Sequence, residues 1–367
     1  MSVLGHGGHG GHGGHGGHGG HGGHGGHGGH GGHGGHSSGA GKGDHAGSGS
    51  SPLLNDALLT TRDGIVGYWK TTEASSPAIP GGTGDDTNLL YLTPTYRGFV
   101  LDYALASAFA VSSTKAGSGK AEIKVNSTKL LDLTRPDTNF LIAQLSHLKT
   151  YADLRGDRIA EINVQIDDLV SFFGALTHLD SGRRRYTLEL VSAVQRLCFY
   201  VEFTVKHLCR TSRPIDFSPS VQPMIQTPAH SSFPNGHACE AFALATVLWR
   251  LRSKKNDVAA AIKDGEMEFR LAERIAANRI VAGVHFPVDT TAGALLGTAI
   301  GQAVIDMAGA GAGAGKIAVI PDLSLGGNPD FDLAAVHGAL GNPVTAVTAH
   351  RNPVLAAFWN LVKTEWA

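Results

Sequence analysis

Apolar residues recur at three- and four-residue steps over most of the chain between Asp137 and Ile305. This period is typical of amphipathic helices. The longest such stripe consists of Leu190, Val194, Leu197, Val201, Val205 and Leu208. Strand-like alternation is clear only in a short segment around residues 121–125. The sequence therefore predicts a mainly α fold, in which several long helices bury one face against each other.

The same patterns divide the chain into four parts. We expect a disordered repeat and a Ser/Gly linker at 1–52, an α-helical catalytic domain at 53–306, a Gly/Ala linker at 307–316 and a C-terminal extension at 317–367. Within the domain, an apolar stripe at 159–176 predicts one helix, and further helices are expected at about 238–252, 258–278 and 287–305. The alternating Gly and Ala at 308–315 lack the GK[ST] ending of a phosphate-binding loop.

The N-terminal tract repeats His-Gly-Gly with a strict period of three from His6 to His36 and contains eleven histidines. Two glycines in every three residues leave too few side chains for a core, which predicts disorder. Regularly spaced imidazoles can ligate Zn²⁺, Ni²⁺ or Cu²⁺. The alternative is a low-complexity repeat whose metal affinity is incidental, and the sequence leaves both open.

The overall charge and the cysteine content limit the partners and the compartment. The formal net charge is −1, so no global field attracts nucleic acid or an anionic membrane. The three cysteines, Cys198, Cys209 and Cys239, are expected to be buried free thiols. The N-terminus has no apolar core of a secretory signal, and no segment has the length of a membrane span. We therefore expect a soluble, cytoplasmic protein, whose oligomeric state the sequence does not predict.

The first cluster of candidate functional residues is Lys206, Arg213 and Pro214. Lys206 lies near the end of the longest stripe, whereas Pro214 disfavours helical geometry for Arg213. A guanidinium at a helix–loop boundary can bind two oxygens of an oxyanion, and a lysine adds a point charge. The alternative is that these cations only complement the C-terminus of the helix.

The second cluster is Pro234-Asn235-Gly236-His237, directly before a predicted helix. Glycine allows the backbone to approach a ligand closely, and the first N–H groups of a helix can bind an anion. His237 would then act as an acid or base at that end. The alternative is an Asn helix cap followed by an ordinary histidine.

The third cluster is Arg279, His285 and Asp289. Pro287 suits the first turn of a helix, which places Asp289 within reach of His285. A carboxylate on one imidazole nitrogen fixes the tautomer and leaves the other nitrogen for nucleophilic attack. The alternative is a surface His–Asp pair beside an unrelated arginine. The occurrence of all three clusters, in order, favours an oxyanion-handling enzyme.

These residues resemble the superfamily of type 2 phosphatidic acid phosphatases, bacterial acid phosphatases and vanadium-dependent haloperoxidases. Its pattern is K-x6-RP, then PSGH, then SR-x5-H-x3-D. The chain matches it from about Lys206 to Gly293, except that Asn235 and Asn278 replace the two serines. The resemblance implies a helical bundle of the acid phosphatase/vanadium haloperoxidase type.

The resemblance also implies a role for each matching residue. The oxyanion-binding residues would be Lys206, Arg213, Asn235, Gly236 and Arg279. The catalytic residues would be His285, as phosphorylated nucleophile or vanadium ligand, His237 as acid–base group and Asp289 as the residue that orients His285.

Since no membrane span is expected, two soluble branches of the superfamily remain: the haloperoxidases and the acid phosphatases. His230 influences the choice between them. The stretch from His230 to His237 resembles the bromoperoxidase pattern, in which this histidine has a halide or supporting role, although it also suits a histidine that bonds only within its loop. We expect a haloperoxidase-like enzyme that uses vanadate and peroxide to oxidise halide. The alternatives are a soluble acid phosphatase that forms a phosphohistidine, without a cofactor, and a non-catalytic metal- or oxyanion-binding protein.

Overall fold

The computed structural model describes residues 52–66, 75–113, 115–310, 316–317, 328–340, 345–346 and 351–367. The α-helices are α1 (Pro52–Val66), α2 (Pro94–Ala106), α3 (Thr138–Tyr151), α4 (Arg155–Val164), α5 (Val170–Thr177), α6 (Arg185–Cys209), α7 (Pro214–Phe217), α8 (Gly236–Ser253), α9 (Val258–Lys263), α10 (Met267–Val281), α11 (Pro287–Met307), α12 (Leu333–Leu340) and α13 (Pro353–Thr364). The strands are β1 (Phe109–Ser112), β2 (Lys120–Val125), β3 (Thr128–Thr134), β4 (Lys316–Ile317) and β5 (Thr345–Ala346). The His-Gly-Gly repeat and residues 311–315 of the predicted Gly/Ala linker lie outside these ranges.

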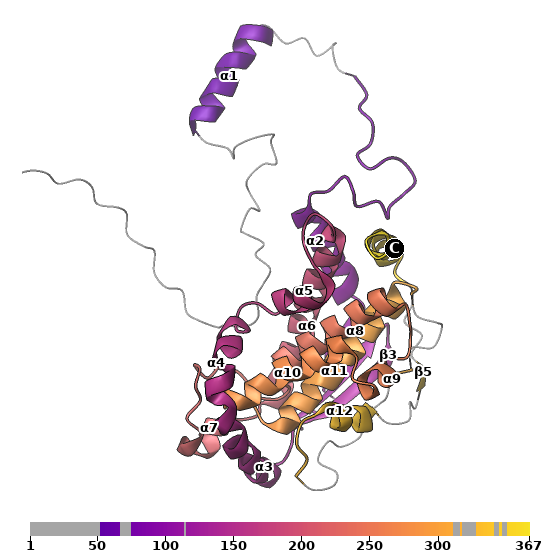
Figure 1. The fold of residues 1–367 in the computed structure, drawn as a ribbon. Coiled ribbons are helices and arrows are strands. Elements are labelled where there is room, and N and C mark those ends of the chain that lie inside the picture. The colour runs from indigo at the N-terminus through magenta and orange to yellow at the C-terminus, as the bar shows by residue number, and fades with distance from the viewer. Residues whose placement is uncertain are drawn as a thin grey trace, which may run out of the picture.

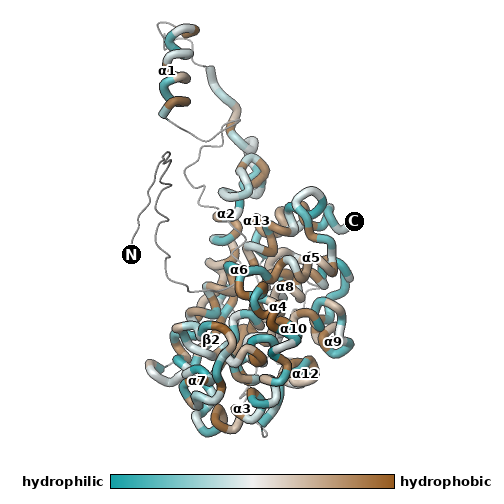
Figure 2. The backbone as a smooth tube through the Cα atoms, turned by 60° about the vertical axis from the view of Figure 1, so that its left-hand side comes forward, coloured by the Kyte–Doolittle hydropathy of each residue, from teal (hydrophilic) through white to brown (hydrophobic). Residues whose placement is uncertain are grey.

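Helices α8 and α11 form the centre of a helical bundle, with α6 and α10 against α8 (Figure 1). Both central helices are buried on nearly all sides: α8 buries 15 of its 18 residues and α11 buries 18 of its 21. Such helices require neighbours around their whole circumference. The mainly α fold predicted from the periodicity is confirmed. Helix α1 buries no residue and lies apart from the bundle (Figure 2).

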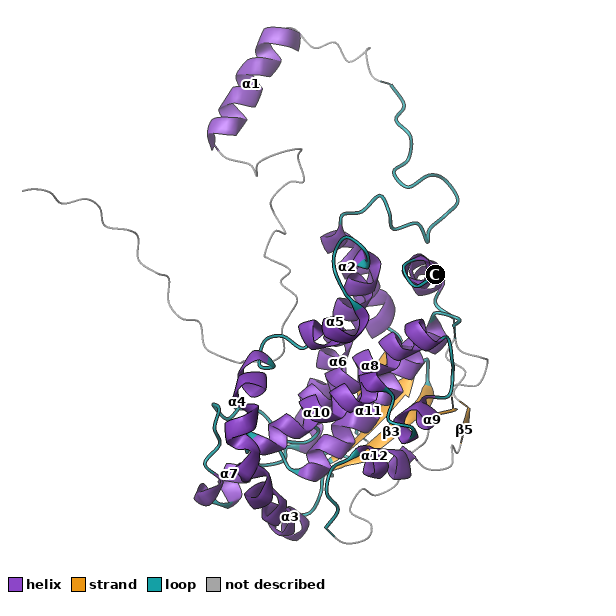
Figure 3. Ribbon diagram, viewed as in Figure 1, coloured by secondary structure: helices purple, strands orange, loops and turns teal. Residues whose placement is uncertain are grey.

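A small antiparallel sheet in the order β1-β2-β3 packs against α6 and α11 (Figure 3). Ile123 of β2 lies opposite Val111 of β1 and Leu131 of β3. Alternate residues of β2 are buried, which fits a strand with one face toward the core. The strand predicted around residues 121–125 is confirmed.

Three glycines at a spacing of four residues allow α8 and α11 to approach closely. A Cβ atom on Gly293 would lie 2.2 Å from the Asn235 carbonyl oxygen, and one on Gly297 would lie 2.0 Å from the Cys239 carbonyl oxygen. Gly301 is similarly close to Thr246. The packing of these helices brings the start of α8 against the start of α11, where the candidate residues lie.

We expect Gly297→Ala to destabilise the protein by about 1–3 kcal/mol or more, because its methyl group would meet backbone that cannot rotate away. Urea unfolding measures the change. Gly156→Ala in α4 is the matched control, since its Cβ would have no atom within 4 Å. Alanine is the better helix former, so the control should be neutral or slightly stabilising. Equal stabilities of both variants would contradict the close packing.

Two helices predicted as continuous are interrupted. The predicted helix at 258–278 is α9 and α10, separated by a turn in which Gly265 has φ +62°. This left-handed conformation suits glycine and stops a helix. The apolar stripe at 159–176 belongs to α4 and α5, which the segment from Gln165 to Leu169 separates. The helices predicted at 238–252 and 287–305 are confirmed as α8 and α11.

Helix α11 alone among the described helices is long and apolar enough to cross a membrane. In the fold, 94% of its apolar window is buried within the protein. The cytoplasmic location expected from the sequence stays a prediction. All three cysteines are buried free thiols, as expected.

Candidate functional site

Three segments that are distant in the sequence meet at the N-terminal ends of α8 and α11. Lys206 lies in the last turn of α6, and Arg213 follows in extended backbone (φ −80°, ψ 157°) as the residue before α7. Asn235 caps α8, and its N–H donates to the Asp289 carbonyl oxygen at 2.8 Å. The predicted end of the helix before Arg213 is confirmed.

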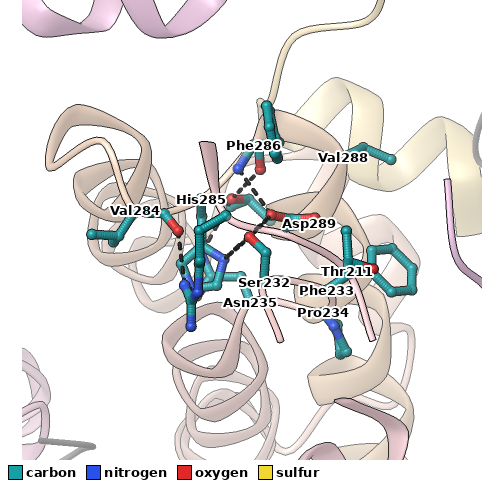
Figure 4. Close-up of polar contacts among 12 residues, drawn as sticks. Thr211, Ser232, Phe233, Pro234, Asn235, Val284, His285, Phe286, Val288 and Asp289 are labelled. Carbon is teal, nitrogen blue, oxygen red and sulfur yellow. Dashed lines mark hydrogen bonds and ion pairs between the residues drawn. The ribbon is translucent and has the colours of Figure 1, made fainter. Parts of the chain in front are cut away.

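His285, Asp289 and Ser232 point toward one another at this junction (Figure 4). The Oδ2 atom of Asp289 lies 3.4 Å from His285 Nδ1. It also accepts from the Ser232 hydroxyl at 2.5 Å and from the Phe286 N–H at 2.9 Å. All these groups are buried, so the carboxylate holds the imidazole in a water-poor environment.

The hydrogen bonds of His285 indicate its tautomer. Its Nε2 lies 3.0 Å from Nη1 of Arg213. Because a guanidinium only donates, Nε2 must accept and therefore carries a lone pair. The ring proton is then on Nδ1, which faces Asp289. This is the tautomer that a nucleophilic Nε2 requires.

Burial shifts the pKa values of both groups. It lowers the pKa of His285 well below its usual value, and the nearby cations Arg213 and Lys206 lower it further. It raises the pKa of Asp289 to about 6, against the opposing effect of the Ser232 and Phe286 hydrogen bonds. At neutral pH the site therefore combines a neutral imidazole with an ionised carboxylate.

Arg213 connects His285 to His230 and to the surface. Its Nε donates to the His230 carbonyl oxygen at 3.0 Å, and Nη2 lies 3.2 Å from His230 Nδ1. Burial lowers the pKa of Arg213 to about 10, which leaves it a cation at neutral pH. An open cavity of about 750 Å³ beside it is lined by Lys206, Arg213, His230 and Phe203, among other residues.

Lys206 is held by backbone and by a buried acid. Its ammonium donates to the carbonyl oxygens of Pro234 and Ser231. Glu202, one turn earlier in α6, is also buried, and its charge opposes the lowering of the Lys206 pKa by burial. A Cβ atom on Gly236 would lie 2.4 Å from Glu202 Oε1, so a larger residue where α8 begins would displace this carboxylate.

His237 and Arg279 meet at a residue outside the three clusters, Gln165. His237 Nε2 lies 2.9 Å from the Gln165 carbonyl oxygen, and Arg279 Nη2 donates to Gln165 Oε1 at 3.2 Å. Arg279 is only 1% exposed, and its Nε and Nη1 have no hydrogen-bond partner among the described residues. Burial lowers the pKa of Arg279 to about 9. Its two unpartnered groups are donors that a bound oxyanion can satisfy.

Part of the chain is similar to known proteins. Residues 189–310 match the PAP2 superfamily. Two relatives are the decaprenylphosphoryl-5-phosphoribose phosphatases of Mycobacterium tuberculosis strains CDC 1551/Oshkosh and ATCC 25618/H37Rv. Each is 30% identical to the chain over 129 residues, which cover 35% of this chain and 65% of the relative.

The fold brings the predicted residues together in two connected groups. Hydrogen bonds join Arg213, His285 and Asp289, with His230 bonded to Arg213. His237 and Arg279 form the second group through Gln165, and His237 adjoins Gly236 at the start of α8. The chemical roles predicted for these residues stay predictions.

Both polar groups of the Asn235 side chain form hydrogen bonds within the protein. Its Oδ1 accepts from the Ala238 N–H at 3.4 Å, and its Nδ2 donates to the Thr290 hydroxyl at 3.2 Å. The side chain thus caps α8 and connects it to α11, as in the alternative considered for this residue. Its contact with an oxyanion stays a prediction.

Sequence reasoning missed three residues of this site: Ser232, Glu202 and Gln165. Ser232 lies within the stretch from His230 to His237, where no local pattern indicates that its hydroxyl donates to Asp289. Glu202 precedes Lys206 by four residues within the apolar stripe, and an acid at that spacing is a usable signal. Gln165 is 113 residues before Asn278, which it also contacts, and no local pattern indicates it.

Proposed function

We propose that this protein is a phosphomonoester hydrolase that transfers the phosphoryl group to His285. The observation that carries the proposal is the fixed tautomer of His285, whose Nε2 lone pair faces Arg213 while Asp289 receives the opposite N–H. The PAP2 match and the relatives named as phosphatases support hydrolysis over halide oxidation.

In the proposed mechanism, the phosphate oxygens bind Arg213, Arg279 and Lys206. His285 Nε2 attacks phosphorus, and the bond from phosphorus to the ester oxygen breaks. Asp289 stabilises the resulting charge on the imidazole. The leaving oxygen takes a proton from His237, which acts as the general acid.

The second step releases phosphate. Water attacks the phosphohistidine, His237 takes a proton from that water, and the bond from phosphorus to Nε2 breaks. The Gln165 carbonyl oxygen can only accept, so the Nε2 of His237 carries a proton and the exchangeable site is Nδ1. The cavity beside Arg213 has room for the alcohol part of a small ester.

Vanadate is a tetrahedral oxyanion that the same residues would hold. His285 Nε2 would be its ligand, and the unpartnered donors of Arg279 fit its oxygens as they fit those of phosphate. When bound, vanadate supplies activation of peroxide for halide oxidation. The two relatives are named as phosphatases, and halide oxidation is therefore the alternative that the assays must distinguish. No group of three or more potential metal ligands occurs in the described part of the chain. The His-Gly-Gly tail, for which the sequence leaves binding of zinc, nickel or copper open, lies outside that part.

The test pairs two assays on the purified protein. One uses a chromogenic phosphate monoester, and the other uses vanadate, peroxide and bromide. We expect ester hydrolysis without bromination. Bromination without hydrolysis would overturn the proposal in favour of the haloperoxidase predicted from His230. Absence of both activities in a folded protein that binds phosphate would favour a non-catalytic oxyanion-binding protein.

We expect kcat/KM to fall as the pH is lowered through about 6. The pKa of Asp289 is about 6, so below this pH the carboxyl group takes up a proton and no longer accepts from His285 Nδ1. His285 itself stays neutral there, because its pKa is well below the ordinary value. A pH–rate profile measures the change. Asp289→Asn should lack this acid limb, and a profile that is flat through pH 6 would contradict the assignment.

A further inference from the structure

Gln165 is a buried residue at the end of α4 that contacts two candidate site residues through different groups. It is 0% exposed. Its backbone carbonyl oxygen accepts from His237, and its side-chain Oε1 accepts from Asn278 at 3.0 Å and from Arg279 at 3.2 Å. One residue therefore sets the position of both the predicted acid–base histidine and a predicted phosphate-binding arginine.

The orientation of the Gln165 amide follows from its neighbours. Asn278 Nδ2 also donates to the Glu161 carboxylate at 3.2 Å, which fixes the nitrogen of Asn278 on that side. Arg279 is likewise a donor, so the group of Gln165 that faces both must be its oxygen. The Gln165 Nε2 group therefore makes no hydrogen bond to Asn278 or Arg279. It is buried and has no hydrogen-bond partner among the described residues.

Two adjacent side chains thus have unpartnered buried donors: Nε2 of Gln165 and both Nε and Nη1 of Arg279. Buried donors without partners are rare and point to a missing acceptor. A tetrahedral oxyanion offers several acceptor oxygens to neighbouring donors. The pair fits such a ligand better than it fits an apolar or cationic one.

The neutrality of Gln165 is the second relevant property. No carboxylate of the described residues forms an ion pair with Arg279, and Gln165 supplies an oxygen without a negative charge. Arg279 is therefore oriented while its positive charge remains uncompensated inside the protein. A glutamate at this position would satisfy the same donors but neutralise that charge.

We propose that Gln165 is a phosphate-binding and positioning residue, which donates from Nε2 to the bound oxyanion and orients Arg279 and His237. The proposal rests on the proposed function for its ligand, a phosphoryl group. It adds a residue outside the three sequence clusters to the phosphate site.

The test measures binding of inorganic phosphate by titration calorimetry for the full chain and two variants. We expect Gln165→Leu to weaken phosphate binding about tenfold or more, the size of one hydrogen bond to a charged group. We expect Gln165→Glu to weaken it further, because the carboxylate pairs with Arg279 and repels the anion. Gln302→Leu, on the distal half of α11, is the matched control and should bind as the wild type does.

The relative phosphate affinities of the two variants distinguish this role from a merely structural one. Glutamate keeps the length and the acceptor for Asn278 and Arg279, so a structural role predicts that Gln165→Glu binds phosphate better than Gln165→Leu. The proposal predicts the reverse order, with Gln165→Glu as thermally stable as the wild type. Binding by Gln165→Glu equal to that of the wild type, or tighter than that of Gln165→Leu, would overturn it. If the wild-type protein binds phosphate but hydrolyses no ester, the proposed hydrolase function is refuted. The phosphate affinities of the two variants still test the role of Gln165 in that case.

Discussion

His285→Ala is expected to reduce hydrolysis of a phosphate monoester by about a thousandfold or more, because no other described residue places a nucleophilic nitrogen at the junction of Arg213 and Asp289. The loss should appear in kcat as well as in kcat/KM, since the step that forms the covalent intermediate is removed. Steady-state kinetics with a chromogenic ester measures it.

His337→Ala is the matched control for this variant. His337 lies in α12, outside the candidate site, and the change removes the same imidazole. The control should keep wild-type turnover. Phosphate binding by His285→Ala should also survive, because the cations Lys206, Arg213 and Arg279 remain. Substantial hydrolysis by His285→Ala would show that another group attacks phosphorus.

Asp289→Asn is expected to reduce kcat by about a hundredfold to ten-thousandfold. The side chain keeps its size, and an amide oxygen can still accept from the Phe286 N–H. The amide is neutral, however, so it cannot stabilise the positive charge that develops on the ring when His285 attacks phosphorus. The imidazolium that forms with the phosphohistidine therefore has no compensating carboxylate.

Asp306→Asn provides a control within the same helix. Asp306 is a largely buried aspartate near the C-terminal end of α11, and burial also raises its pKa to about 6. Its replacement should leave kcat unchanged, although it can alter stability. Equal activity of the two variants would show that the proximity of Asp289 to His285 has no catalytic consequence.

Much of this site was predictable because its residues occupy informative local positions. Pro214 and Pro287 mark the ends and starts of helices, so they correctly placed Arg213 in extended backbone and His285 just before α11. The helical periods likewise predicted α6, α8 and α11. These features depend on neighbouring residues, which a sequence states directly.

The remaining features depend on contacts between distant segments. The role of Gln165 arises from the packing of α4 against α10, and that of Ser232 from a loop that reaches the first turn of α11. The break between α9 and α10 was missed because the apolar period continues across Gly265, and only the backbone conformation shows the turn. The bonds of Asn235 to Ala238 and Thr290 also required the relative placement of two helices.

The central claim is that His285 Nε2 receives the phosphoryl group. The most direct measurement is to mix the protein with a phosphate monoester, quench the reaction in base, where phosphohistidine survives, and locate the phosphoryl group by peptide mass spectrometry. We predict one phosphoryl group on the peptide that contains His285, and none in His285→Ala. A phosphoryl group on another residue, or hydrolysis without any trapped intermediate on His285, would contradict the account.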